Sequence, residues 1–195
     1  MKPYVVGITG ASGALYGVRF VQVLSELGHD IALVVSDAAR LVIQEELQVP
    51  FSDLFDPNVL ERVSFYSNRD FAAPIASGSY PTQGMVIIPC SMGTLGHIAS
   101  GATQNLIHRA ADCTVKEGRR FVIVPREMPL SALHLENLLK LARLGARVLP
   151  ASPAFYSGAQ TIPDLVDFVV GKVLDSLEIP HAIYPRWTGR TVKAG

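Results

Sequence analysis

The chain has 195 residues, which fits one α/β domain and leaves no room for two of ordinary size. Lysine and arginine together number 17, as do aspartate and glutamate, so the formal net charge is zero. A nucleic-acid-binding protein normally carries a basic excess, so this balance argues against that class. Charged residues make up 17% of the chain, below the ~25% of a typical soluble domain. The shortage of polar surface predicts that part of the surface is buried in an oligomer.

The sequence carries no sign of a membrane or export segment. No stretch approaches the ~20 uninterrupted apolar residues that a membrane helix needs. Residues 3–8 read as a strand of the fold rather than as a signal peptide. Two cysteines, Cys90 and Cys113, are too few for a disulfide framework or a cysteine-based metal site. We therefore expect a cytoplasmic protein with no membrane partner.

Short apolar runs alternate with longer helical patterns along the chain. Strands are predicted at residues 3–8, 31–35, 63–66, 85–89, 121–125 and 147–150. Helices are predicted at about 14–27, 37–47, 103–117, 132–144 and 163–178, whereas residues 90–101 read as a glycine- and serine-rich connection. Apolar strands without clean alternation are buried on both faces. The pattern predicts one domain over 1–195, with a doubly wound, mostly parallel α/β sheet, helices on both faces and a Rossmann- or flavodoxin-like topology.

Polar residues follow four of these strands, where ligands bind in a parallel sheet. They are the Thr9–Gly13 turn, Ser36, the Cys90–Ser91 pair with Thr94, and the Arg126–Glu127 pair. Because parallel strands end at one edge of the sheet, we expect these residues to open onto one cleft. Ser36 stands where a dinucleotide-binding protein carries an acidic residue, which favours a mononucleotide.

The Thr9–Gly13 turn has two readings. Its glycines let the backbone approach a ligand, and the helix that follows offers free N–H groups to an anion. Such turns are also common as simple connections between a strand and a helix.

Five cations fall between residues 109 and 126, and they divide by context. Arg119 and Arg120 are predicted to lie on a solvated basic face. Arg126 follows an apolar strand, where a merely solvated arginine is less expected. Lys172 lies on an apolar flank of its helix, so the commoner interpretation is a lysine that extends from apolar surface to water.

Several chemistries have no motif in the chain. There is no aspartate-rich sequence for Mg²⁺ and a diphosphate, no H-E-x-x-H and no G-x-S-x-G. Cys90 is more readily a small packed apolar residue than a nucleophile.

The chain resembles the UbiX-type flavin prenyltransferases over nearly its whole length. The motifs that carry the resemblance are Thr9–Gly13, Tyr16–Gly17, Ser36, Ala76–Ser79, Pro89–Leu95, Asn105–Asp112, Lys116–Glu117, Val124–Leu130, Pro153–Tyr156 and Pro185–Trp187. The resemblance implies an enzyme that moves a dimethylallyl group from dimethylallyl monophosphate to N5 and C6 of reduced FMN. The product, prenylated FMN, serves UbiD-type decarboxylases. The resemblance also implies no metal, a dodecamer with sites built from several subunits, and a C-terminal tail (about 179–195) that reaches a neighbour.

The resemblance also assigns roles residue by residue. FMN would be bound by Gly10, Ala11, Ser12, Ser36, Ser91, Met92, Gly93, Thr94 and Arg126. The donor phosphate would meet Lys116, Arg126, Glu127, Tyr156 and Lys172. Glu46 and Trp187 match family site residues near the phosphate and the flavin, and they join Lys116, Arg126 and Glu127 as the expected catalytic group.

Two alternatives from other classes remain at this stage. One is an FMN-dependent cysteine decarboxylase-like flavoprotein, and the other is a flavin carrier without enzymatic activity. The absence of an aspartate-rich motif agrees with a monophosphate leaving group whose charge is neutralised by lysine and arginine.

Overall fold

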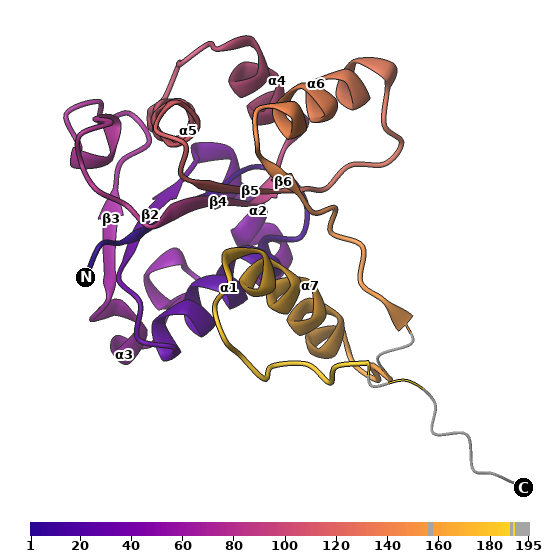
Figure 1. Cartoon of the computed structure of the whole chain (residues 1–195). Coiled ribbons are helices and arrows are strands. Elements are labelled where there is room, and N and C mark those ends of the chain that lie inside the picture. Colours follow the sequence, from indigo (N-terminus) through magenta and orange to yellow (C-terminus); the bar gives the residue numbers. More distant parts are fainter. Residues whose placement is uncertain (156–157, 188, 190–195) are drawn as a thin grey trace, which may run out of the picture.

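A computed structural model describes residues 1–155, 158–187 and 189. Its centre is a six-stranded sheet in the order β3-β2-β1-β4-β5-β6, and every strand pair is parallel (Figure 1). The strands are β1 (Tyr4–Ile8), β2 (Ile31–Val35), β3 (Val63–Tyr66), β4 (Gly84–Cys90), β5 (Arg120–Pro125) and β6 (Arg147–Val148). The strand order reverses between β1 and β4, which confirms the predicted doubly wound sheet.

Helices cover both faces of the sheet (Figure 1). One face packs against α1 (Ala14–Glu26), α2 (Asp37–Leu47), α3 (Pro57–Leu60) and α7 (Ile162–Leu177). The other face packs against α4 (Met92–Ser100), α5 (Leu106–Lys116) and α6 (Ala132–Arg143). Two short 3₁₀ helices lie at Phe51–Asp53 and Pro74–Ala76.

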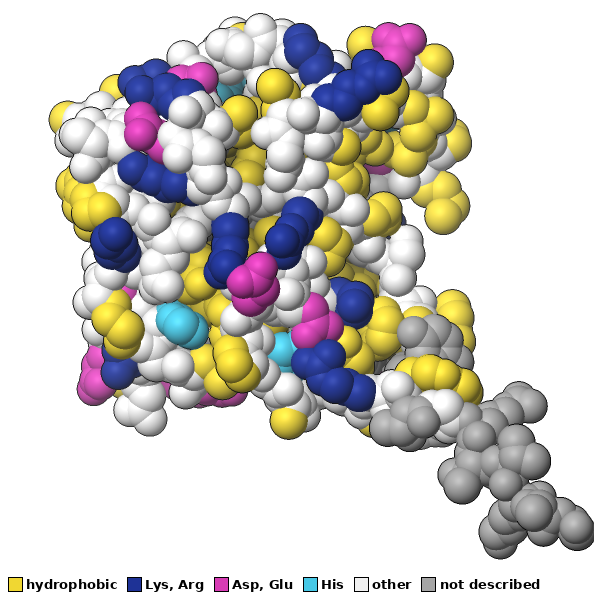
Figure 2. Space-filling view, viewed as in Figure 1, with side chains coloured by type: hydrophobic (Ala, Val, Ile, Leu, Met, Phe, Trp, Pro, Cys, Tyr) yellow, Lys and Arg dark blue, Asp and Glu magenta, His cyan; other side chains and the backbone are white. Residues whose placement is uncertain are grey.

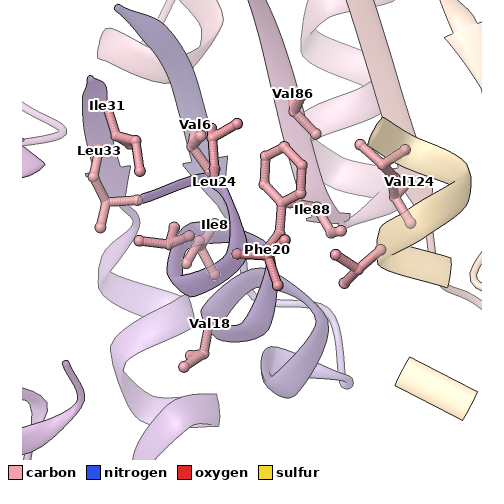
Figure 3. Packing of buried hydrophobic residues seen from close by; sticks show 14 of the residues in the cluster. Val6, Ile8, Val18, Phe20, Leu24, Ile31, Leu33, Val86, Ile88 and Val124 are labelled. Atoms are coloured by element: carbon pink, nitrogen blue, oxygen red, sulfur yellow. The ribbon is translucent and has the colours of Figure 1, made fainter. Parts of the chain in front are cut away.

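Alternate residues of a strand belong to the two layers of the hydrophobic core, which lie on opposite faces of the sheet. Val6 and Ile8 of β1 face α1, where Phe20 and Leu24 pack against them (Figure 3). Val5, which directly precedes Val6, belongs to the layer under α4 and α5. The central strands are thus buried on both faces, as their unbroken apolar runs predict.

The prediction for residues 90–101 was wrong, because this segment forms helix α4. The Ser91 side chain accepts from the Thr94 N–H to begin the helix, and Gly101 ends it in a left-handed conformation at φ 75°. Met92, Leu95 and Ala99 form its buried stripe. Glycines at 93 and 96 hide this spacing in a sequence reading, whereas burial of one face stabilises the helix despite them.

The predicted solvated face was wrong for Arg119, which is half-buried, whereas Arg120 is exposed as predicted but is also hydrogen-bonded. The Arg119 guanidinium donates to the backbone oxygens of Gly78 and Tyr80, so it holds the loop before β4. The Arg120 guanidinium bonds to the backbone oxygen of Leu177 and to the Glu178 carboxylate at the end of α7. Both arginines therefore connect segments that are distant in the sequence. Among the described residues, no helix combines the length and apolarity needed to cross a bilayer.

Candidate functional site

Three backbone contacts bring the predicted strand-end residues to one edge of the sheet. The Ser36 N–H donates to the Ile8 oxygen at 3.0 Å, and the Arg126 N–H donates to the Cys90 oxygen at 3.3 Å. The Ser91 N–H donates to the Thr9 hydroxyl at 2.8 Å. The glycine turn, Ser36, the start of α4 and the end of β5 therefore border one region, as the sequence predicts.

The Thr9 side chain joins the two central loops of this edge. Its hydroxyl donates to the Pro89 oxygen at 2.8 Å while accepting from the Ser91 N–H at the same distance, and the residue is 2% exposed. These bonds fix the spacing between the 10–13 turn and the 91–94 segment. The Thr9–Gly13 turn was predicted to lie at this edge, but no role was predicted for Thr9 itself, because its two partners lie about 80 residues away in the sequence.

Ser36 and Ser91 each begin a helix at this edge. The Ala39 N–H donates to Ser36 Oγ at 3.1 Å, and the Thr94 N–H donates to Ser91 Oγ at 3.3 Å. Ser91 also donates to the Thr94 hydroxyl at 3.1 Å. The positive ends of α2 and α4 thus both lie at this edge of the sheet, where they favour an anion.

Gly10 brings the glycine turn against the start of α2. A Cβ at this position would lie 2.6 Å from the Ala38 Cβ, so a side chain here would force the two elements apart. The close approach explains the glycine better than a simple connecting role does.

Glu46 of α2 occupies the N-terminus of α1. Its carboxylate accepts from the Gly13 N–H at 3.0 Å and from the Ala14 N–H at 2.8 Å. Burial raises the pKa of Glu46, but hydrogen bonds from Ser12, Gly13 and Ala14 and the Arg126 charge outweigh it, so the pKa lies below its usual value. The expectation that this helix start receives a ligand anion is therefore corrected, because a protein carboxylate already holds these two N–H groups.

Arg126 and Glu127 extend the site beyond β5. The Arg126 charge acts on Glu46 and also on Tyr16, whose pKa is raised by burial and lowered in part by this arginine. The Glu127 carboxylate accepts from the Met128 N–H at 3.0 Å. Arg126 and Glu127 line a cavity of about 180 Å³ together with Pro150 and Ser152. An arginine and a carboxylate at one opening can bind a phosphate and hold a proton beside it.

Lys172 borders a neighbouring cavity. This cavity of about 320 Å³ is lined by Lys172, Phe168 and Leu149, and it shares Pro150 and Ser152 with the opening at Arg126. A larger hollow of about 560 Å³ lies between α2 and Phe51, and no predicted site residue lines it. Arg126, Glu127 and Lys172 thus border the two smaller cavities and not this hollow.

Lys116 is not brought to this edge. Lys116 ends α5 four residues before β5 begins, near the amino edge of the sheet, and its Nζ lies 3.2 Å from Glu117. Trp187 follows α7 in the C-terminal tail and is 65% exposed. Tyr156 lies outside the described residues. One chain thus assembles the predicted FMN set, Glu46, Glu127 and Lys172, but not Lys116.

A model of the flavoprotein family matches residues 1–174. The flavin prenyltransferase UbiX of Halalkalibacterium halodurans is 53% identical over 191 residues, covering 94% of this chain and 92% of that protein. The UbiX of Pseudomonas aeruginosa is 44% identical, covering 93% and 92%.

Solved structures agree with these relatives. The crystal structure of AnUbiX in complex with FMN and dimethylallyl pyrophosphate is 40% identical, covers 97% of this chain and 98% of its own, and has a TM-score of 0.91. A dodecameric FMN-dependent UbiX-like decarboxylase from Escherichia coli O157:H7 is 43% identical, covers 97% of this chain and all of its own, and has a TM-score of 0.89. The peptidyl-cysteine decarboxylase EpiD, at 16% identity and a TM-score of 0.62, shares the fold alone. The chain therefore belongs to the flavoprotein family and, within it, to the UbiX flavin prenyltransferases, which confirms the resemblance.

Proposed function

We propose that this protein transfers a dimethylallyl group from dimethylallyl monophosphate to N5 and C6 of reduced FMN. The carbon–oxygen bond to the phosphate breaks as the bond to N5 forms, and the carbon–carbon double bond of the donor is consumed as the bond to C6 forms. N5 and C6 each lose a proton; one proton is balanced by the proton that adds to the double bond, and the other leaves with the phosphate. The prenylated FMN then serves a UbiD-type decarboxylase. The observation that carries the proposal is the joint placement of Ser36, Ser91 and Arg126 at one sheet edge, in a chain of this family.

The flavin supplies the nucleophilic nitrogen and carbon, and the chain supplies binding and charge. The residues present fit a mononucleotide, because two helix N-termini and the Ser12, Ser36 and Ser91 hydroxyls border the edge. The residues that contact the nucleotide are Gly10, Ala11, Ser12, Ser36, Ser91, Met92, Gly93, Thr94 and Arg126.

The donor phosphate binds to Arg126, Glu127 and Lys172 of this chain and to Tyr156. It also binds to Lys116. Arg126 neutralises the departing phosphate, and Lys172 adds a second positive charge across Pro150 and Ser152. Glu46 orients Arg126 through its charge, and Trp187 offers an aromatic face to the allylic cation that develops. Because phosphate neutralisation by these cations replaces a metal, the reaction needs no divalent ion.

We also propose the cytoplasm as the compartment. Cys90 and Cys113 are both free and buried, which suits a reducing environment.

A Lys172→Ala variant tests the division between nucleotide and donor. We expect FMN binding to persist while prenylation slows by about tenfold to a hundredfold, because one charge-assisted contact to phosphate contributes ~1.5–3 kcal/mol. Excess donor restores part of the rate if Lys172 serves ground-state binding, and none if its contact forms only in the transition state.

The matched control is Lys140→Ala, which removes a lysine from the exposed surface of α6. Its rate and FMN affinity should equal those of the wild type. A Lys172→Ala protein that assembles normally yet fails to hold FMN would place this residue in the nucleotide half of the site.

A further inference from the structure

Asp175, in the last turn of α7, is the centre of a polar cluster that holds the tail. Its carboxylate accepts from the Tyr184 hydroxyl at 2.7 Å, from Arg186 at 2.8 Å and from His181 Nε2 at 3.1 Å. The Asp175 side chain is 23% exposed. Three residues of the segment that follows α7 therefore converge on one carboxylate of the helix.

The tail packs on α7 at a glycine. A Cβ at Gly171 would lie 2.3 Å from the Tyr184 ring and 2.9 Å from the His181 ring, so both rings rest directly on the helix backbone. The His181 side chain is fully buried, and the Tyr184 ring lies 5.0 Å from the Phe168 ring between centroids. Residues 181–186 are thus seated by packing as well as by hydrogen bonds.

The same carboxylate contacts two residues connected with the proposed donor site, Lys172 itself and the residue that precedes Trp187. Lys172 Nζ lies 3.5 Å from Asp175 Oδ2, and Arg186 directly precedes Trp187. Burial raises the pKa of Asp175, but hydrogen bonds from Arg186, Tyr184 and His181 hold it well below its usual range. The carboxylate is therefore charged at neutral pH, and it fixes the distance between Lys172 and the residue before Trp187.

We propose that Asp175 is a positioning residue for prenyl transfer, which holds residues 181–186 on α7 so that Trp187 and Lys172 keep a fixed relation to the site. Asp175 acts through these two side chains and does not itself contact the substrates. The inference rests on the proposed function, in which Trp187 lies near the flavin.

The chain has a single tryptophan, so its emission reports the position of the tail. Bound FMN quenches a nearby tryptophan, and the extent of quenching falls as Trp187 moves away. The test uses the assembled full-length protein and an Asp175→Asn variant, which keeps the side-chain size and removes the charge. We expect FMN affinity within about twofold of the wild type, clearly weaker quenching of Trp187, and kcat about tenfold lower.

Asp167→Asn is the matched control. Asp167 lies on the same helix and forms an ion pair with Arg19 of α1 at 2.7 Å, away from the tail. The charge change is the same, so the control can lower the free energy of unfolding but should leave the quenching unchanged.

Equal quenching and equal kcat in Asp175→Asn and the wild type would overturn the proposal. If that variant fails to assemble, Tyr184→Phe removes only one hydrogen bond to Asp175 and should shift the quenching in the same direction, whereas wild-type quenching in this variant would count against the tail contact. A wild-type protein that binds FMN but transfers no prenyl group would instead refute the proposed function, and the quenching comparison would still decide whether Asp175 holds the tail.

Discussion

Thr9 makes two hydrogen bonds with one buried hydroxyl, so its loss leaves the Ser91 N–H and the Pro89 oxygen without this partner. We expect Thr9→Val to lower the free energy of unfolding by ~1–3 kcal/mol and to weaken FMN binding, because the 91–94 segment loses its tie to the glycine turn. Thr9→Ser keeps the hydroxyl and should restore most of the affinity. Urea unfolding and flavin titration measure the two effects, and wild-type FMN affinity in Thr9→Val would refute the positioning role.

His108 makes stability depend on pH. Burial, with the charge of the stacked His97, lowers the pKa of His108 to about 4, whereas the unfolded residue titrates near ~6.5. The contribution of neutral His108 to the free energy of unfolding is fully present above pH ~6.5. It is lost as the pH falls toward 4, because only the unfolded chain takes up the proton in that range.

The expected slope is at most ~1.4 kcal/mol per pH unit, measured as the wild-type free energy of unfolding minus that of His108→Gln. Parallel pH profiles for the two proteins would contradict the assignment.

Some site residues could be predicted at this scale and some could not. Ser36, Ser91 and Arg126 directly follow buried strands, and parallel strands end at one edge, so topology alone brings them together. Glu46 is different, because it lies near the end of a helix and reaches Gly13 and Ala14 only through the packing of α2 beside α1. No local pattern records that packing, and the role of Glu46 came from the family resemblance.

At the scale of elements, the close contact between the glycine turn and α2 can be tested by substituting the glycine. Gly10→Ala places a Cβ 2.6 Å from the Ala38 Cβ, so α2 must shift. We expect a lower free energy of unfolding and weaker FMN binding, measured by urea unfolding and flavin titration.

Gly96→Ala is the matched control in α4, where a Cβ would meet Asn137 at an ordinary 3.7 Å. Alanine favours a helix over glycine by ~1 kcal/mol, so this control should be as stable as the wild type or more stable. If both variants behave alike, the close approach at Gly10 does not constrain α2.

The central strands β1, β2, β4 and β5 could be predicted well because each is dominated by a short run of buried apolar residues. Helix α4 could not, since its stripe of Met92, Leu95 and Ala99 is interrupted by Gly93 and Gly96, and glycine is typical of loops. The hydrogen bonds of Arg119 and Arg120 could not be predicted for a related reason. Their carbonyl partners at Gly78 and Leu177 are distant in sequence, and a charge cluster alone does not distinguish a bonded arginine from a solvated one.

At the scale of the whole molecule, Lys116 and Arg126 lie toward opposite edges of the sheet. The outer surface of α6 is also apolar, with Leu133, Leu135 and Leu139 at least half exposed (Figure 2). Both facts favour an assembly in which one chain supplies Lys116 to the site of another, whereas residues 181–186 pack on α7 of their own chain. We expect sedimentation to show an oligomer and no active monomer.

Mixed assemblies test this arrangement. Lys116→Ala and Arg126→Ala should each be inactive alone, whereas oligomers formed from both variants together should regain part of the activity, because some sites then contain an intact lysine and an intact arginine from different chains. Each variant assembled with itself is the control. Mixed oligomers that form but stay inactive would show that Lys116 does not act across subunits.

The central claim is tested most directly by incubating the purified protein with reduced FMN and dimethylallyl monophosphate, with and without a metal chelator. Mass spectrometry of the flavin and a phosphate assay are read together. The account predicts a flavin heavier by one five-carbon isoprene unit, one phosphate released for each product, and the same rate with chelator present. Unchanged FMN without phosphate release would contradict the transfer, and a rate lost to chelation and restored by Mg²⁺ would contradict the cationic phosphate site.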